Sequence, residues 1–309
     1  MQDNFDQVPP IQPARIVLHL GALKTATTYI QSALDSHRDK LRDSGTELLL
    51  PKDLRPDQHL AFSSNLTGDA FRDQATRSRE RLDHLISDAL ERSSRLILSE
   101  EGILGASRLN LTRKQVYPDL PRRLTYLPEQ LDHERVEICF TLRSYDRFFA
   151  SNLTTVARRG KVFDFDKLRR PLMHLERGWP EVLADIAAAF PRARLTVWRF
   201  EDFPKHRQAI LAHLAGQPLH DDGGRYVNRS LSADAMSALA RKADKKGNVP
   251  DGKLLAKRMA RRFPASDTVP AYFPWSDRDA RTLRDAYDEH WTLIRTTLPG
   301  TNTFDAAST

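Results

Sequence analysis

Short apolar runs alternate along this chain with longer segments in which apolar residues recur at steps of three and four. The runs predict five strands, over Ile16–Leu20, Glu47–Leu50, Arg95–Ser99, Val136–Leu142 and Leu195–Phe200. The periodic segments predict helices over Tyr29–Leu41, Arg79–Glu91, Arg122–Leu131, Tyr145–Arg158, Trp179–Phe190, Ala209–Leu214, Ala233–Lys242 and Asp277–Thr297. This alternation is typical of parallel βαβ units. We therefore expect a three-layer α/β fold, with a central, mostly parallel five-stranded sheet, helices on both of its faces and a helical C-terminal extension.

The length and composition set the domain organisation that we expect. With 309 residues, 40% of them hydrophobic, the chain can build one large core. Residues 1–14 are polar and contain prolines, so we expect them to be disordered, while 15–309 form a single domain whose part from about 231 onward is a helical cap. There is no run of 18 apolar residues and the single cysteine is Cys139, so we expect a cytoplasmic protein without a membrane span or a disulfide framework.

The first predicted strand leads into a candidate anion site. Gly21 ends the apolar run, and Lys24, Thr25, Ala26, Thr27 and Thr28 then lead into a helix. The first turn of a helix presents unpaired N–H groups and the positive end of the helix dipole, which suits a phosphate or sulfate group. The simpler interpretation is a capped helix with a solvated lysine, but one cap needs only one hydroxyl. The segment is not a Walker A loop, because the second glycine of that motif is missing before the lysine.

A second anion site is predicted at the end of the fourth strand. Arg143 follows the strand directly, and Ser151 lies eight residues later in the next predicted helix. Eight residues make a little over two helical turns, so both side chains can point into one cleft. The alternative for this pair is a salt bridge of the arginine and a serine that bonds back to its own helix.

Together the two motifs resemble those of sulfotransferases that use 3′-phosphoadenosine 5′-phosphosulfate (PAPS), which have a P-loop-like fold. In that family a Lys-[Ser/Thr]-Gly-Thr-Thr core binds the 5′-phosphosulfate, and an arginine and a serine eight residues apart bind the 3′-phosphate. Here Ala26 stands where the family has glycine, which matters if that position needs a positive φ. The resemblance extends to Phe200–Phe203 and to Asn228–Ser230, and covers roughly 15–230.

The resemblance implies a role for each matching residue. Lys24 would contact the bridging oxygen of the phosphosulfate, and Thr25–Thr28 would hold the 5′-phosphate. Arg143 and Ser151 would hold the 3′-phosphate. Tyr29 would lie against the adenine, and Arg229 is a weaker candidate for contact with the nucleotide. The product would be adenosine 3′,5′-bisphosphate. No metal site is indicated, since the scattered histidines and the single cysteine lack ligand spacing.

In-line transfer of a sulfuryl group needs a cation at the leaving oxygen and a base at the acceptor hydroxyl. Lys24 is the candidate cation. Three residues compete as the base, namely Glu101, Glu100 and His59, and we favour Glu101. Adjacent carboxylates on an extended strand face opposite ways, so only one of the two glutamates is expected to enter the cleft.

The net charge of +7 is concentrated in residues 241–262, which hold nine Lys or Arg and two Asp. Such a segment can attract an anionic polymer, although a solvated helix face is the commoner explanation. The acceptor that we expect is a glycan, a glycolipid or a small hydroxylated molecule, and not a nucleic acid. Two other functions stay open, a P-loop kinase of a small metabolite and a non-catalytic binder of polyanions.

Overall fold

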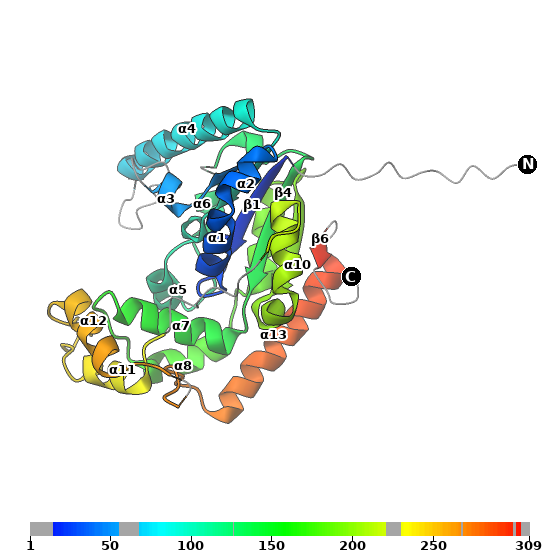
Figure 1. The fold of residues 1–309 in the computed structure, drawn as a ribbon. Helices are drawn as coiled ribbons and strands as arrows, with labels where there is room; N and C mark the ends of the chain where they lie inside the picture. Colours follow the sequence, from blue (N-terminus) through cyan, green and yellow to red (C-terminus); the bar gives the residue numbers. More distant parts are fainter. Residues whose placement is uncertain are drawn as a thin grey trace, which may run out of the picture.

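The computed structural model describes residues 15–55, 68–125, 127–220, 230–266, 268–298 and 301–303. They form an α/β fold around an open sheet of six strands in the order β2-β3-β1-β4-β5-β6, all of them parallel (Figure 1). The strands are β1 Ile16–Gly21, β2 Thr46–Leu49, β3 Arg95–Ser99, β4 Val136–Leu142, β5 Arg194–Arg199 and β6 Thr301–Thr303. The three central strands β1, β3 and β4 carry apolar side chains on both faces because helices cover both sides.

The predicted number of five strands was wrong by one. All five apolar runs form strands, but β6 pairs with β5 near the C-terminal end of the described chain. Its sequence, Thr301-Asn302-Thr303, has no apolar residue and is only partly buried. Such a strand forms because it pairs with its neighbour and not because of its own hydrophobic pattern. The pattern of apolar residues therefore did not predict β6.

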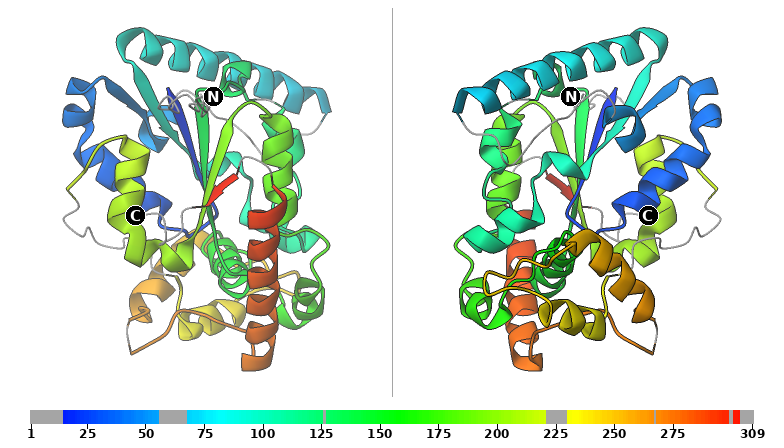
Figure 2. Two further views of the ribbon diagram at one scale, coloured as in Figure 1. Left: turned by 90° about the vertical axis from the view of Figure 1, so that its right-hand side faces the viewer. Right: turned by 90° about the vertical axis from the view of Figure 1, so that its left-hand side faces the viewer.

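Two helical layers cover the sheet, as the two views of Figure 2 show. One layer consists of α1 Thr27–Ser36, α2 Arg38–Asp43 and α10 Phe203–Ala215, which pack on Val17 and Cys139. The other layer includes α4 Gly68–Arg92, α6 Leu120–Leu124, α7 Tyr145–Ala157, α9 Trp179–Ala189 and α13 Asp277–Thr297, which pack on Leu18 and Phe140. Successive residues of a strand therefore pack into the hydrophobic cores on opposite faces of the sheet, because side chains alternate between the two faces along a strand.

The remaining elements are short or lie at the edges. They are α3 Pro51–Leu54, η2 Glu101–Ile103, α5 Ser107–Arg113, η3 Glu129–Leu131, α8 Phe165–Met173, η4 Phe200–Asp202, α11 Ala233–Ala240 and α12 Gly252–Arg262. Helices α11 and α12 form a lobe with a small core of its own against Ala157, the last residue of α7. Within the part predicted as a helical cap, α13 packs into the main core, whereas α11 and α12 belong to the lobe.

The strand order places a crevice at the carboxyl ends of β1 and β4. These neighbours pair in register, with Gly21 opposite Thr141. The chain leaves β1 toward α1 on one face of the sheet and leaves β4 toward α7 on the other. Ligands of open parallel sheets bind where adjacent strands diverge in this way.

The four tryptophans are core residues. Trp179 is fully buried among Tyr117, Phe140, Tyr145 and Phe148, and its indole Nε1 donates to the carbonyl of Arg143 at 2.8 Å. The other three are at most 7% exposed. None of them offers an open ring face to a sugar, and Trp179 instead fixes the backbone at the end of β4.

No helix among the described residues combines the length and the apolar character that crossing a membrane would need.

His19 in β1 is a buried titratable group. Its ring stacks on Trp198 at 6.0 Å, and Nδ1 hydrogen-bonds to Ser99 Oγ at 2.9 Å, whereas Nε2 has no partner among the described residues. Burial disfavours the charged imidazolium and lowers the pKa of His19 from 6.5 to about 4.

The pKa of His19 predicts a loss of stability in acid. Between pH 6.5 and about 4 the unfolded chain binds a proton that the folded chain does not, so the free energy of unfolding falls by about 3 kcal/mol as the pH falls through this window. Urea denaturation at pH 7, 5 and 4 measures this. A His19→Asn variant keeps a hydrogen-bonding group near Ser99 and should lose that part of the pH dependence. The exposed control His84→Asn should keep it, and equal slopes in both variants would contradict the assignment.

Candidate functional site

The loop after β1 folds back over the strand end in a strained conformation. Lys24 and Ala26 both have positive φ, of 66° and 60°. The hydroxyl of Thr25 donates to the carbonyl of Ala22 at 2.6 Å and so closes the turn. Gly21 is needed for close approach, because a Cβ at this position would collide with Thr27 Oγ1. The loop thus adopts the left-handed conformation at Ala26, where the resembled family has glycine.

Ala26 is also the N-cap of α1, and it cannot cap the helix with a side chain. The loop therefore leads straight into a helix whose first-turn N–H groups receive no hydrogen bond from the N-cap side chain. The interpretation that the threonines only cap α1 does not fit this geometry. The arrangement favours an anion at the helix start.

Arg143 joins the two strand ends. Its Nη1 donates to the carbonyl of Lys24 at 2.6 Å and to Ser151 Oγ at 3.0 Å, and its guanidinium lies 4.9 Å from the ring centre of Phe200. The spacing of eight residues does bring Arg143 and Ser151 together. The backbone N–H of Ser144 donates to Glu201 at 3.0 Å, so the segment after β5 holds the start of α7.

Among the described residues, Lys24, Arg143 and Arg158 are three of the four cations that line this crevice. Burial lowers the pKa of Lys24, and the nearby charges of Arg158 and Arg143 lower it further. Burial also lowers the pKa of Arg143, to about 10, and that of Arg158. Desolvation destabilises the charged form of each of these side chains, and like charges nearby further destabilise that of Lys24. A bound anion would stabilise these charged forms and so raise the three pKa values again. The electrostatics are those of a site for a multiply charged anion.

The crevice opens as a cavity of about 430 Å³, which we call the first cavity. Lys24 and Arg143 both line it, so the two predicted anion sites face a shared space. Its other lining residues are Leu23, Ala26, Thr27, Thr28, Tyr29, Glu101, Thr155, Arg158, Arg159, Phe200 and Ser230. A cavity of this volume is within the range of sites for small molecules.

The two glutamates after β3 have different environments. Glu100 is 3% exposed, binds the guanidinium of Arg55 through both carboxylate oxygens, and accepts from the N–H of Gly102 at 2.7 Å. Glu101 lines the first cavity, where its Oε2 accepts from Gln31 Nε2 at 3.2 Å. Of the two, only Glu101 faces the cations of the first cavity, whereas Glu100 holds the turn.

A second cavity of about 380 Å³ adjoins the first. Four residues line both of them, namely Leu23, Glu101, Thr155 and Arg159. The walls found only in the second cavity are Arg55, Glu100, Gly102, Gly105, Ala106, Ser107 and Arg123. Glu101 therefore stands between two neighbouring spaces, each large enough for a small ligand or part of a larger one.

The walls of both cavities contain buried polar atoms without a hydrogen-bond partner among the described residues. They are Thr27 Oγ1 and Arg143 Nε in the first cavity, Ser107 Oγ in the second, and Thr155 Oγ1 in both. Buried polar groups are normally paired, because an unpaired one costs about 1–3 kcal/mol. These four atoms add polar groups to the walls of the two neighbouring cavities.

The other residues predicted for the site lie as follows. Tyr29 is 7% exposed and lines the first cavity, and its ring packs against Phe203 at 5.9 Å. Thr25 and Ser151 are buried and do not line it, since the hydroxyl of Thr25 closes the loop and Ser151 supports Arg143. His59 and Arg229 lie outside the described residues.

Sequence reasoning missed several wall residues. Thr155, Arg158 and Arg159 lie at the C-terminal end of α7, and Ser107 begins α5. For Thr155 the sequence offered one indication, its position four residues after Ser151, which places both residues on the same face of the helix. Ser107 carries no such signal, because α5 itself was not predicted.

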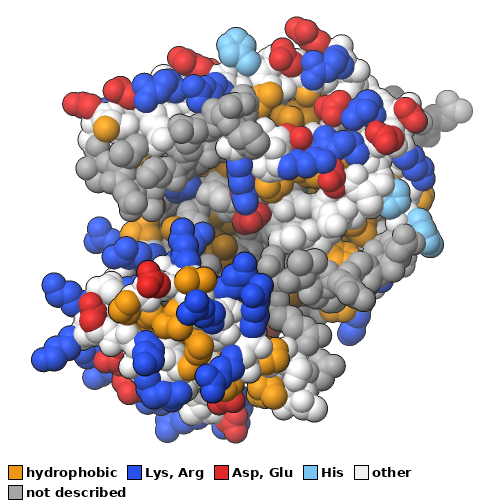
Figure 3. Space-filling view, turned by 60° about the vertical axis from the view of Figure 1, so that its left-hand side comes forward, with side chains coloured by type: hydrophobic (Ala, Val, Ile, Leu, Met, Phe, Trp, Pro, Cys, Tyr) orange, Lys and Arg blue, Asp and Glu red, His pale blue; other side chains and the backbone are white. Residues whose placement is uncertain are grey.

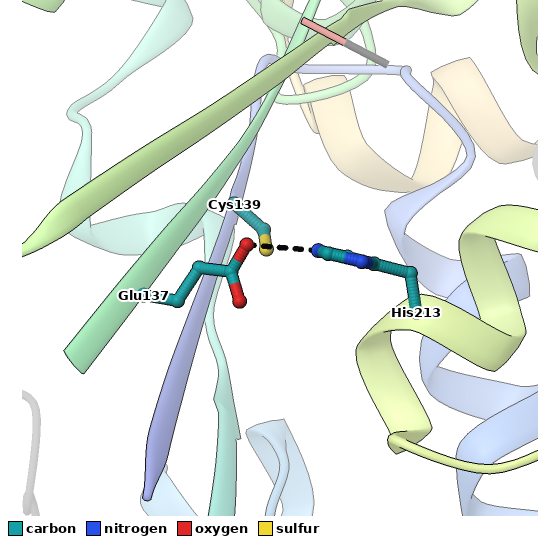
Figure 4. A group of neighbouring side chains, drawn as sticks. All are labelled: Glu137, Cys139 and His213. Carbon is teal, nitrogen blue, oxygen red and sulfur yellow. Dashed lines mark hydrogen bonds and ion pairs between the residues drawn. The ribbon is translucent and has the colours of Figure 1, made fainter. Parts of the chain in front are cut away.

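A separate group of potential metal ligands lies away from the crevice (Figure 4). Glu137 and Cys139 of β4 and His213 of α10 bring their ligand atoms within 4.8 Å of one another. Glu137 Oε1 is already engaged, by Thr196 Oγ1 at 2.6 Å and His213 Nε2 at 2.8 Å. Burial raises the pKa of the Cys139 thiol well above its usual value, and a protonated thiol is a poor ligand. The group fits a hydrogen-bonded link between sheet and helix.

Comparison with protein-family models and with curated proteins gives no match. Among solved structures, a chain of the PezAT chromosomal toxin–antitoxin system of Streptococcus pneumoniae is 10% identical, with a TM-score of 0.28, and the match covers 92% of this chain and 89% of that one. A sulfotransferase domain from the curacin biosynthetic pathway is 14% identical, with a TM-score of 0.33, over 82% of this chain and 99% of that one.

Proposed function

We propose that this protein is a PAPS-dependent sulfotransferase that moves a sulfuryl group to an acceptor hydroxyl of a glycan, a glycolipid or a small hydroxylated molecule. The observation that carries the proposal is the opening of Lys24 and Arg143 into one cavity, from two different strand ends. PAPS has phosphate groups at two positions of one adenosine, and a site with two cationic ends suits such a donor.

In this proposal the first cavity takes the donor. The start of α1 and Lys24 bind the 5′-phosphosulfate, and Arg143 binds the 3′-phosphate through the donor atoms that its bonds to Lys24 and Ser151 leave available. Tyr29 and Phe200 offer ring surface for the adenine.

The proposed reaction needs groups on both sides of the sulfur. The acceptor oxygen forms a bond to sulfur, its proton passes to the Glu101 carboxylate, and the bond from sulfur to the phosphate oxygen breaks. The electron pair leaves with adenosine 3′,5′-bisphosphate, and the Lys24 ammonium stabilises the charge on the leaving oxygen. The position of Glu101 in the walls of both cavities supports this role, and we propose that the acceptor binds in the second cavity.

Nucleotide binding tests the donor. By calorimetry without magnesium, adenosine 3′,5′-bisphosphate should bind at least tenfold more tightly than adenosine 5′-phosphate, because the charged contact at the 3′-phosphate is worth about 1.5–3 kcal/mol. Arg143→Lys loses the planar guanidinium and should lose most of this preference. The control Arg147→Lys changes an exposed arginine four residues later, in α7, and should keep it. Tight binding of ATP that depends on magnesium would instead support a kinase.

Replacement of the proposed cation should slow turnover without unfolding the protein. We expect Lys24→Ala to lower the rate of sulfuryl transfer from labelled PAPS by about 10²–10³, measured with the best acceptor from a panel of hydroxylated compounds. Lys52→Ala removes an exposed lysine and should be neutral. A Lys24→Ala enzyme with the parental rate would refute the assignment.

Replacement of the proposed base should affect chemistry and not donor binding. Glu101→Gln keeps the shape of the side chain but cannot accept a proton, so the rate should fall by about 10²–10⁴ and the acidic limb of the pH–rate profile should disappear. The affinity for adenosine 3′,5′-bisphosphate should stay within a few-fold. An unchanged rate in Glu101→Gln together with a loss in His59→Ala would assign the base to His59.

A further inference from the structure

The exposed face of α12 is a dense band of positive charge. Lys253, Lys257, Arg258, Arg261 and Arg262 are all exposed, and at 100° per residue they occupy about half of the helix circumference. Leu254, 52% exposed, is the apolar residue among them. Figure 3 shows Lys and Arg side chains gathered over this lobe, at the lower left of the view. The helix is about 16 Å long, so its cations are too far apart for one small anion and suit a polymer.

The apolar side of α12 is already used by the fold. Ala256 is buried, and Leu255, Met259 and Ala260 pack with it against the core of the lobe. An amphipathic helix that inserts into a membrane needs this side for the lipid. The exposed face of α12 can therefore bind by charge at the surface, but it has little apolar area to insert.

The first residue of α12 lies near the wall of the two cavities. Gly252, the first residue of α12, lies against Gly160 so closely that neither position has room for a Cβ. Gly160 directly follows Arg158 and Arg159, which line the first cavity, and Arg159 also lines the second. The basic helix α12 therefore begins beside the chain segment that carries Arg158 and Arg159.

We propose that α12 is a docking surface for an acidic polysaccharide, whose chain continues past Arg159 so that one of its hydroxyl groups enters the second cavity. The proposal rests on the sulfotransferase function and specifies the acceptor. A polymer with carboxylate or sulfate groups along its length matches the spread of the five cations. The exposed face of α12 has no aromatic residue on which bases could stack, so single-stranded nucleic acid fits it less well.

Direct binding without any nucleotide tests the docking surface. We would measure hyaluronan, which has carboxylates and free hydroxyls, and neutral dextran by fluorescence anisotropy at 50 mM and 200 mM salt. The variant Lys257→Ala/Arg258→Ala/Arg261→Ala should bind hyaluronan about tenfold more weakly than the parent, with a shallower salt dependence. The control Arg77→Ala/Arg81→Ala/Arg92→Ala removes the same charge from α4, at the opposite end of the molecule (Figure 1), and should bind like the parent.

The outcomes separate this proposal from the sulfotransferase proposal. Equal binding by parent and α12 variant, equal loss in the control variant, or binding of dextran as tight as hyaluronan would overturn the docking surface. Tighter binding to vesicles with phosphatidylserine, or to DNA, with the same dependence on α12 would also overturn it. Since these assays contain no donor, they leave the calorimetry with adenosine 3′,5′-bisphosphate to decide the reaction.

Discussion

A hydrogen bond from Arg143 Nη1 to the carbonyl of Lys24, at 2.6 Å, joins the two loops that form the crevice. The parallel pairing of β1 and β4 brings the two strand ends level, with Gly21 opposite Thr141, but pairing alone does not fix the loops beyond them. The guanidinium does this, because it is planar and can donate to the loop and to Ser151 together. Its burial lowers the pKa of Arg143 even though the carboxylate of Glu201 lies nearby, so the same side chain ties the two loops together and favours a further anion in the crevice.

The loop after β1, to which Arg143 donates a hydrogen bond, has an unfavourable backbone conformation. Two non-glycine residues with left-handed backbone, Lys24 and Ala26, cost about 1–2 kcal/mol each. The bond from Thr25 to Ala22 and the close approach at Gly21 hold that shape before any ligand binds. A loop formed in advance loses little entropy on binding, which favours tight and specific recognition of an anion.

The parts of this architecture that follow local pattern could be predicted from the sequence, and the parts that depend on distant neighbours could not. The five apolar runs became strands, and the spacing of Arg143 and Ser151 correctly placed them together. Strand β6 escaped prediction because its threonines are paired only through β5. The use of the Thr25 hydroxyl within the loop, and the position of Thr155 between two cavities, depend on how separate elements pack, which residue spacing alone does not encode.

The lobe of α11 and α12 has a core of its own, which has an evolutionary consequence. Stability depends mainly on the inner side of α12, so residues on its outer side can be exchanged at little cost to folding. The crevice between β1 and β4 is built from other elements and has no such freedom. Under our proposals, proteins descended from this chain could come to bind other polymers through substitutions on the outer side of α12. The reaction in the crevice would stay the same.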